Sequence, residues 1–157
     1  MLIHHFAHQA NGSPAHYLCG GWLEEWCWIA GKELENGEAY KRLESDRWDV
    51  SRKIEPFAAL NKDDPPNELD AVYIHRNRML LIECKTGAMD QNTLYKLEVI
   101  SRQFGGRLNA KWLLTMRDIQ PDTTTWKRAK LYGIEIIGPK EIGQLKEKIR
   151  GWMTWQN

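Results

Sequence analysis

The stretch that decides the fold runs from Asn67-Glu68-Leu69-Asp70 to Ile82-Glu83-Cys84-Lys85-Thr86-Gly87. Between these two motifs lie two short apolar runs, residues 71–74 and 79–84, separated by the polar residues 75–78. Two such runs joined by a short polar segment are typical of a β-hairpin. Because both faces of both strands are largely apolar, we expect the hairpin to lie in a covered, central part of a sheet.

The register of this hairpin brings charged residues together at one end. A turn centred on residues 76–77 places Asp70 directly opposite Glu83, and directly opposed residues have Cβ atoms about 4.5–5.5 Å apart. Side chains alternate along a strand, so Glu83 and Lys85 share one face and the Cys84 side chain points away. The sequence therefore predicts two carboxylates and an ammonium at one end of an apolar hairpin.

Opposed carboxylates in apolar surroundings repel each other and are costly to bury, and a divalent cation removes that cost. Mg²⁺ or Mn²⁺ would bind Asp70 and Glu83, with the peptide carbonyl of Cys84 as a further ligand. Lys85 would orient or help to deprotonate an attacking water, or stabilise charge in the transition state. This combination predicts metal-assisted phosphodiester hydrolysis. The alternative is that Glu83 and Lys85 form a surface ion pair and Asp70 is a turn residue.

Length and composition are those of an ordinary globular chain. With 157 residues, 42% of them hydrophobic and 27% charged, we expect one domain with a substantial core rather than a disordered chain. No apolar run approaches the ~20 residues needed to cross a bilayer, and the first residues lack the features of a signal peptide. The three cysteines, Cys19, Cys27 and Cys84, form no CxxC pair, and this favours a reducing, cytoplasmic setting.

The remaining pattern predicts helices on both sides of the hairpin. After Gly20-Gly21, apolar residues recur at helical spacing, with Trp22 and Trp26 expected in the core. Further along we expect, in order, a strand at 48–54, a loop at 61–67, a helix at 92–104, a strand at 111–116, a helix at 124–131, a strand at 133–137 and a helix at 140–153. This order predicts an α/β fold with a mixed sheet flanked by helices.

These motifs resemble those of a known superfamily. ELD followed by IECKTG resembles the PD-(D/E)XK restriction-endonuclease-like nucleases. GGWLEEW, NELDAVYI, LLIECKTG and LYKLEVISRQFGG resemble, more narrowly, the C-terminal nuclease domain of CRISPR-ancillary effectors, which carry a CARF sensor domain that binds cyclic oligoadenylate. The resemblance implies a restriction-endonuclease-like core, a mixed sheet with a catalytic hairpin, over residues 18–157. Residues 1–17 are expected to form an irregular N-terminal arm.

The resemblance also implies an activity in anti-phage defence: a metal-dependent nuclease acting on DNA, RNA or both, preferably single-stranded. Asp70, Glu83 and Lys85 would be its catalytic core, and Glu24 would be the acid of the first helix, with Glu25 as the alternate. Such nucleases usually act as homodimers. The chain leaves no room for a CARF domain of usual size, so the domain stands alone, belongs to a longer product or relies on a sensor partner. A catalytically silent nucleic-acid-binding or scaffold domain is the alternative.

Substrate contacts are expected from two regions. The resemblance implies that Lys96 and Gln103, on the predicted helix after the hairpin, point toward the substrate. Residues 101–130 carry seven basic and two acidic side chains on a chain whose net charge is only +1. Lys127, Arg128 and Lys130 surround Trp126 in this stretch. Their charges could bind successive phosphates of a nucleic acid, and a base could stack on the Trp126 ring. The alternative is a solvated helix face with a packing tryptophan.

Overall fold

The structure is a computed structural model that describes residue 15 and residues 17–35, 70–75, 78–105 and 109–154. A π-helical turn, η1, precedes the first long helix, and a 3₁₀ turn, η4, precedes the last one. In chain order the elements are η1 (Tyr17–Gly21), α3 (Trp22–Glu35), β1 (Ala71–His75), β2 (Arg78–Lys85), α4 (Gln91–Gly105), β3 (Asn109–Thr115), α5 (Thr124–Tyr132), β4 (Ile134–Ile137), η4 (Ile142–Gln144) and α6 (Leu145–Thr154).

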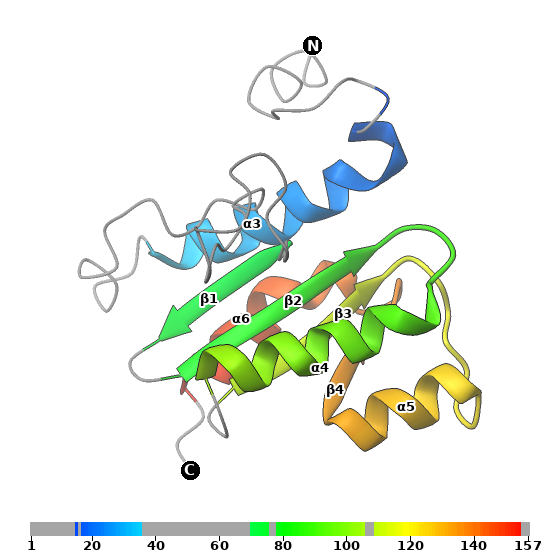
Figure 1. The fold of residues 1–157 in the computed structure, drawn as a ribbon. Helices are drawn as coiled ribbons and strands as arrows, with labels where there is room; N and C mark the ends of the chain where they lie inside the picture. The colour runs from blue at the N-terminus through cyan, green and yellow to red at the C-terminus, as the bar shows by residue number, and fades with distance from the viewer. Residues whose placement is uncertain (1–14, 16, 36–69, 76–77, 106–108, 155–157) are drawn as a thin grey trace, which may run out of the picture.

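The four described strands form one sheet in the order β1-β2-β3-β4 (Figure 1). β1 and β2 are antiparallel, whereas β2, β3 and β4 run parallel to one another. The mixed sheet is therefore confirmed. Ala71 pairs with Ile82 and His75 pairs with Arg78, which is the predicted hairpin register. Extended by one residue, this register sets Asp70 beside Glu83.

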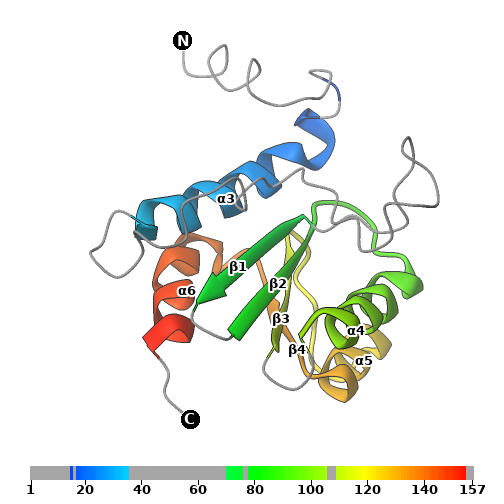
Figure 2. The same cartoon turned by 60° about the vertical axis from the view of Figure 1, so that its left-hand side comes forward.

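Helices cover both faces of the sheet. α3 and α6 lie on one side, and α4 and α5 lie on the other (Figure 2). The two sides hold separate hydrophobic clusters, and β2 contributes to both because its side chains alternate: Leu80, Ile82 and Cys84 point toward α3 and α6, and Leu81 points toward α4 and α5. The predicted covered hairpin is thus confirmed for β2, and Cys84 points away from the side that Glu83 and Lys85 share.

Two local expectations were wrong. Trp26 is 45% exposed, because α3 buries the neighbouring stripe of Leu23, Cys27, Ala30 and Leu34 instead, while Trp22 packs half-buried against that core. The last helix does not begin at residue 140. A 3₁₀ turn that contains Gly143 comes first, and α6 starts at Leu145, which is the first fully buried residue of this segment.

The start of α6 at Leu145 has a physical reason. Glycine disfavours a helix by about 1 kcal/mol, and burial of the helix begins to stabilise it only from Leu145 onward.

Three other expectations fall on residues that the structure does not describe: the strand at 48–54, the loop at 61–67 and most of the arm at 1–17. Among the described helices, none is both long and apolar enough to cross a bilayer.

The contact between α3 and β1 gives a first prediction. A Cβ atom built on Gly31 would lie 1.9 Å from Cε1 of Tyr73, so the helix backbone rests directly on the tyrosine ring. We expect Gly31→Ala to destabilise the protein by about 1–3 kcal/mol, because the ring or the helix must move. Urea denaturation would measure this change.

The matched control is Gly151→Ala. Gly151 is exposed in α6, and apart from the adjacent backbone of its own helix no atom lies within 4 Å of the position that a Cβ atom would occupy there. Alanine at this position should raise stability by about 0.5–1 kcal/mol through helix propensity alone. A Gly31→Ala variant as stable as the parent would contradict the close packing of α3 on Tyr73.

Candidate active site

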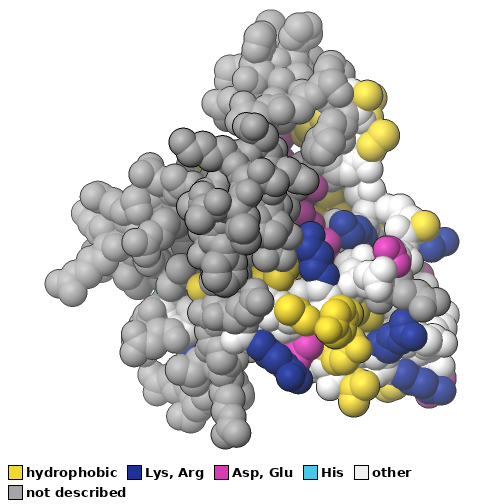
Figure 3. All heavy atoms as spheres, in the orientation of Figure 1, with side chains coloured by type: hydrophobic (Ala, Val, Ile, Leu, Met, Phe, Trp, Pro, Cys, Tyr) yellow, Lys and Arg dark blue, Asp and Glu magenta, His cyan; other side chains and the backbone are white. Residues whose placement is uncertain are grey.

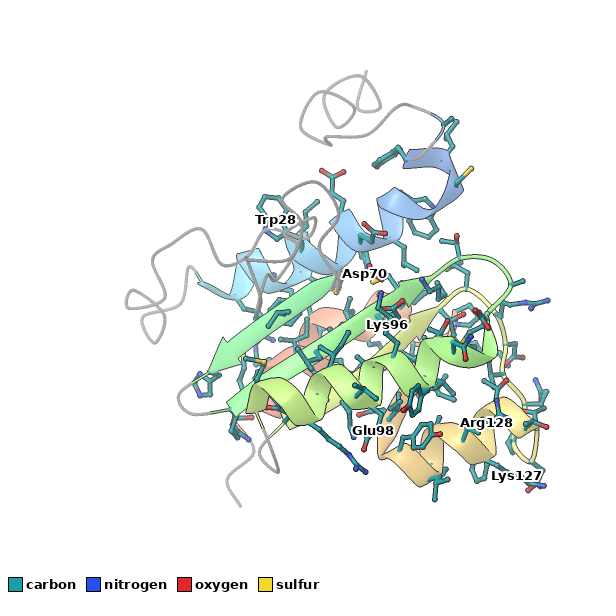
Figure 4. The ribbon with its side chains drawn as sticks, in the orientation of Figure 1. Trp28, Asp70, Lys96, Glu98, Lys127 and Arg128 are labelled. Carbon is teal, nitrogen blue, oxygen red and sulfur yellow. The ribbon has the colours of Figure 1, made fainter. Side chains whose placement is uncertain are left out.

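Two carboxylates lie buried where β1 begins and β2 ends. Asp70 directly precedes β1 and is 9% exposed, and Glu83 near the end of β2 is 8% exposed. Figure 4 shows Asp70 at this end of the hairpin. Their closeness follows from the hairpin register, and their burial follows from the helices that cover both faces of the sheet. The predicted juxtaposition of Asp70 and Glu83 is therefore present in the fold.

Lys85 forms an ion pair with one of these carboxylates. Its Nζ lies 2.8 Å from Oε1 of Glu83, and its side chain is 35% exposed. Burial works against the charged form of Lys85, but the hydrogen bond to Glu83 and the charges of Glu83, Asp70 and Glu24 outweigh it, so the pKa of Lys85 is raised. The ammonium therefore stays protonated at neutral pH and is not a proton acceptor.

Asp70 is held by the backbone of the opposite strand. The Cys84 N–H donates to Oδ2 of Asp70 at 2.6 Å. Burial raises the pKa of Asp70 to about 8, and the charges of Glu83 and Glu24 act in the same direction, while the Cys84 hydrogen bond and Lys85 oppose them. Without a further cation, this carboxyl group holds a proton at neutral pH.

A third acidic residue, Glu24, lies in the first turn of α3, near enough for its charge to act on this end of the hairpin but not near enough to form a three-residue metal group with Asp70 and Glu83. Its charge acts on both Asp70 and Lys85. Glu25 is not among the main charges that act on either pKa, its buried Oε2 accepts no hydrogen bond from the described residues, and burial raises its own pKa. The family resemblance implied Glu24 as the acid of the first helix, with Glu25 as the alternate, and Glu24 is the one whose charge acts on the pKa values of Asp70 and Lys85.

The turn that precedes α3 is hydrogen-bonded to the residue that follows β2. The hydroxyl of Thr86 donates to the carbonyl oxygen of Cys19 at 2.8 Å. A Cβ atom on Gly20 would lie 3.2 Å from the same hydroxyl, so η1 passes close to Thr86. Since Thr86 follows Lys85 directly, this contact fixes the turn that leads to Glu24 against the strand that carries Glu83 and Lys85.

The Cys84 thiol lies on the other face of the sheet. Its hydrogen bond with Cys27 and its burial hold the pKa of the thiol well above its usual range. The Tyr73 hydroxyl donates to the Cys27 carbonyl and lies 3.4 Å from the Cys27 Sγ. Only the backbone of Cys84 therefore reaches the carboxylates, as its predicted role as a carbonyl ligand requires.

The chemistry of this donor set fits a hard divalent cation. Within the described part of the chain, no three His, Cys, Asp or Glu side chains gather closely enough to enclose a metal by themselves. Asp70 and Glu83 nevertheless offer two buried carboxylates whose charges a cation would compensate. Mg²⁺ is typically bound in this way, by one or two carboxylates with water and substrate phosphate completing its shell.

The predicted nucleic-acid-binding residues lie in two places. Lys96 is exposed on α4 (Figure 4), whereas the side chain of Gln103 is not among those that the structure describes. Lys127 is exposed and Arg128 half-buried on α5, away from the carboxylates (Figure 4). Nζ of Lys130 lies 5.4 Å from the centroid of the Trp126 ring, a cation–π contact.

The structure also places residues at the site that the sequence did not indicate. The Met116 N–H donates to the carbonyl oxygen of Lys85 at 3.1 Å, so the segment after β3 borders the end of β2. Met116 is 38% exposed, and Arg117 is exposed beside it. Because β2 and β3 are parallel strands joined through α4, no local sequence signal sets their register.

The mixed sheet and its carboxylate–carboxylate–lysine cluster define a restriction-endonuclease-like nuclease domain. A family model described as "Card1-like, endonuclease domain" matches residues 13–156, and the chain belongs to this family. The match confirms the resemblance to CRISPR-ancillary nucleases of the PD-(D/E)XK type, and it indicates nuclease activity.

Two solved structures are similar to this chain. Protein VC1899 from Vibrio cholerae has 26% sequence identity and a TM-score of 0.63, over 88% of this chain and 35% of that one. Can2 from Sulfobacillus thermosulfidooxidans, solved in complex with cyclic tetra-adenylate, has 20% identity and a TM-score of 0.56, over 89% and 38%. The chain thus spans little more than a third of either protein. A search of curated proteins found no match.

Proposed function

We propose that this domain is a Mg²⁺- or Mn²⁺-dependent endonuclease that hydrolyses phosphodiester bonds in DNA, RNA or both, with a preference for single strands. The observation that carries the proposal is the convergence of Asp70, Glu83 and Lys85 at the end of the hairpin, with both carboxylates buried. Membership in the endonuclease family supports it.

Each residue has a defined part in such a reaction. Asp70, Glu83 and the carbonyl of Cys84 would hold the cation, which when bound polarises the phosphate and lowers the pKa of a water molecule. Lys85, kept protonated by Glu83, is placed to donate to a phosphate oxygen and to stabilise the charge that develops in the transition state. Glu24 remains as the carboxylate that orients the attacking water.

Control of this activity belongs to the same proposal. The two similar solved chains are almost three times as long as the region they share with this one, and one of them binds cyclic tetra-adenylate. We propose that a CARF-type sensor, fused to this domain or contributed by a partner, regulates the nuclease, and that the active form is a homodimer. The alternative function is a silent nucleic-acid-binding or scaffold domain.

A cleavage assay tests the proposed activity. The purified chain would be incubated with labelled single- and double-stranded DNA and RNA in the presence of Mn²⁺, Mg²⁺ or EDTA. The control is the double variant Asp70→Asn/Glu83→Gln, which keeps the shape of both side chains. Cutting that requires metal and disappears in the control would support the nuclease. Nucleic-acid binding without any cutting, with and without cyclic tetra-adenylate, would favour the silent domain.

The basic residues of α5 give a second prediction. Replacing Lys127, Arg128 and Lys130 by glutamine should weaken binding to all oligonucleotide sequences alike. The slope of log affinity against log salt should fall by about 2, since each lost phosphate contact to a single strand removes about 0.7. Fluorescence anisotropy at several salt concentrations measures both effects. An unchanged slope would mean that the nucleic acid does not run along α5.

A further inference from the structure

The segment after β3 is held in a fixed position beside the catalytic lysine. Lys85 pairs with Thr115, the last residue of β3, and Thr115 is fully buried. The next N–H, from Met116, donates to the Lys85 carbonyl, and the Arg117 N–H donates to Oγ1 of Thr115 at 3.1 Å. These bonds tie the backbone of Arg117 to the strand end that carries Lys85.

The Arg117 side chain differs from several other basic side chains of the described residues. Arg102 and Lys111 both pair with Glu98, Lys148 pairs with Glu135 and Glu141, and Lys140 lies 3.8 Å from Asp118. Each of these cations already has a carboxylate partner within the protein. Arg117 is exposed and makes no ion pair with any described carboxylate. Its charge is therefore available to a ligand.

The charge balance of the site calls for such a cation. In the metal-free protein Asp70 holds a proton, but Glu24 and Glu83 still outnumber Lys85 among the described residues at this end of the hairpin, so an approaching phosphate is repelled unless positive charge flanks the site. Acidic and basic side chains lie next to each other on the described surface in this region (Figure 3). Arg117, whose backbone is held next to the strand that carries Lys85, would supply that charge in a form suited to bidentate phosphate binding.

We propose that Arg117 binds a backbone phosphate of the single-stranded substrate adjacent to the phosphate that is cleaved, with the exposed Met116 side chain against the neighbouring sugar or base. This inference rests on the proposed nuclease function and adds a substrate-binding residue to it. It gives the strand a path that crosses the carboxyl ends of β2 and β3, close to Lys85.

Binding and cleavage by Arg117→Gln test the proposal. A labelled oligo-dT and a labelled oligo-U would be titrated in EDTA between about 50 and 200 mM salt, where phosphate contacts affect affinity most visibly. We expect a three- to tenfold loss of affinity and a salt slope lower by about 0.7 for Arg117→Gln, with Arg117→Lys keeping most of the slope. In the cleavage assay, KM should rise by the same factor while kcat changes less than about twofold.

The control is Arg150→Gln, which removes an exposed arginine from α6 on the opposite face of the sheet. It should leave affinity, slope and KM unchanged. An Arg117→Gln variant that binds like the parent, or an equal loss in Arg150→Gln, would overturn the assignment of Arg117 while leaving the nuclease intact. A parent chain that binds neither oligonucleotide and cuts neither would instead overturn the proposed function itself.

Discussion

Replacing Lys85 by methionine should reduce cleavage at least about a hundredfold and leave metal binding in place. The reason is the placement of the ammonium, since Lys85 points from the end of β2 toward the carboxylates and is held there by Glu83 at 2.8 Å. Its pKa is raised, so it delivers a full positive charge at neutral pH. Methionine keeps the length of the side chain but cannot offset charge on a phosphate oxygen.

Two measurements separate this effect from a loss of structure. Calorimetric titration with Mn²⁺ should give an affinity no weaker than that of the parent, because removing a nearby positive charge does not disfavour a cation. Lys148→Met is the matched control, since Lys148 is comparably buried at 25% exposure and pairs with two glutamates on the other face of the sheet. That variant should keep its cleavage rate. Undiminished cleavage by Lys85→Met would remove Lys85 from the mechanism.

The hairpin part of the site could be predicted from the sequence because its geometry is local. A short turn between two apolar runs allows one register, and that register alone places Asp70 beside Glu83. The position of Arg117 could not be predicted in the same way. β3 joins the sheet through the helix α4, and the pairing of Lys85 with Thr115 depends on how α4 packs rather than on a turn.

The buried face of α3 could not be predicted from the sequence, for a different reason. Trp22 and Trp26 have the same spacing as Leu23 and Cys27, so periodicity alone does not decide which of the two stripes is buried. The decision comes from small residues further along the helix. Ala30 and Gly31 let α3 approach the Tyr73 ring, and this turns Trp26 outward. In this orientation of α3, the charge of Glu24 acts on the pKa of Asp70.

The metal-free protein should lose stability as the pH rises from about 4 to about 8, and Asp70→Asn should remove most of that loss. Burial, with the charges of Glu83 and Glu24, raises the pKa of Asp70 from 3.8 to about 8 in the folded protein. Between these two pH values the folded state binds more protons than the unfolded state, so folding is favoured by acid. The contribution is full below about pH 4 and is lost as the pH rises through the folded pKa.

The slope of this loss has an upper limit of about 1.4 kcal/mol per pH unit for one group, and chemical denaturation in EDTA at several pH values would measure it. Asparagine can still accept the Cys84 N–H and has no charge to bury, so Asp70→Asn should be more stable than the parent at pH 8 and inactive. Asp118→Asn, at an exposed carboxylate, is the control and should keep the parental slope.

Magnesium should raise the stability of the parent protein at pH 8, as Asp70→Asn does. A cation that binds the ionised carboxylates stabilises the folded state by mass action, and it should flatten the pH profile of the parent while leaving Asp70→Asn almost unaffected. Stability lost through burial of Asp70 is then recovered only when the metal is present, so one residue would link folding to metal binding. A parent whose stability at pH 8 does not respond to Mg²⁺ or Mn²⁺ would contradict the assignment of Asp70 as a metal ligand.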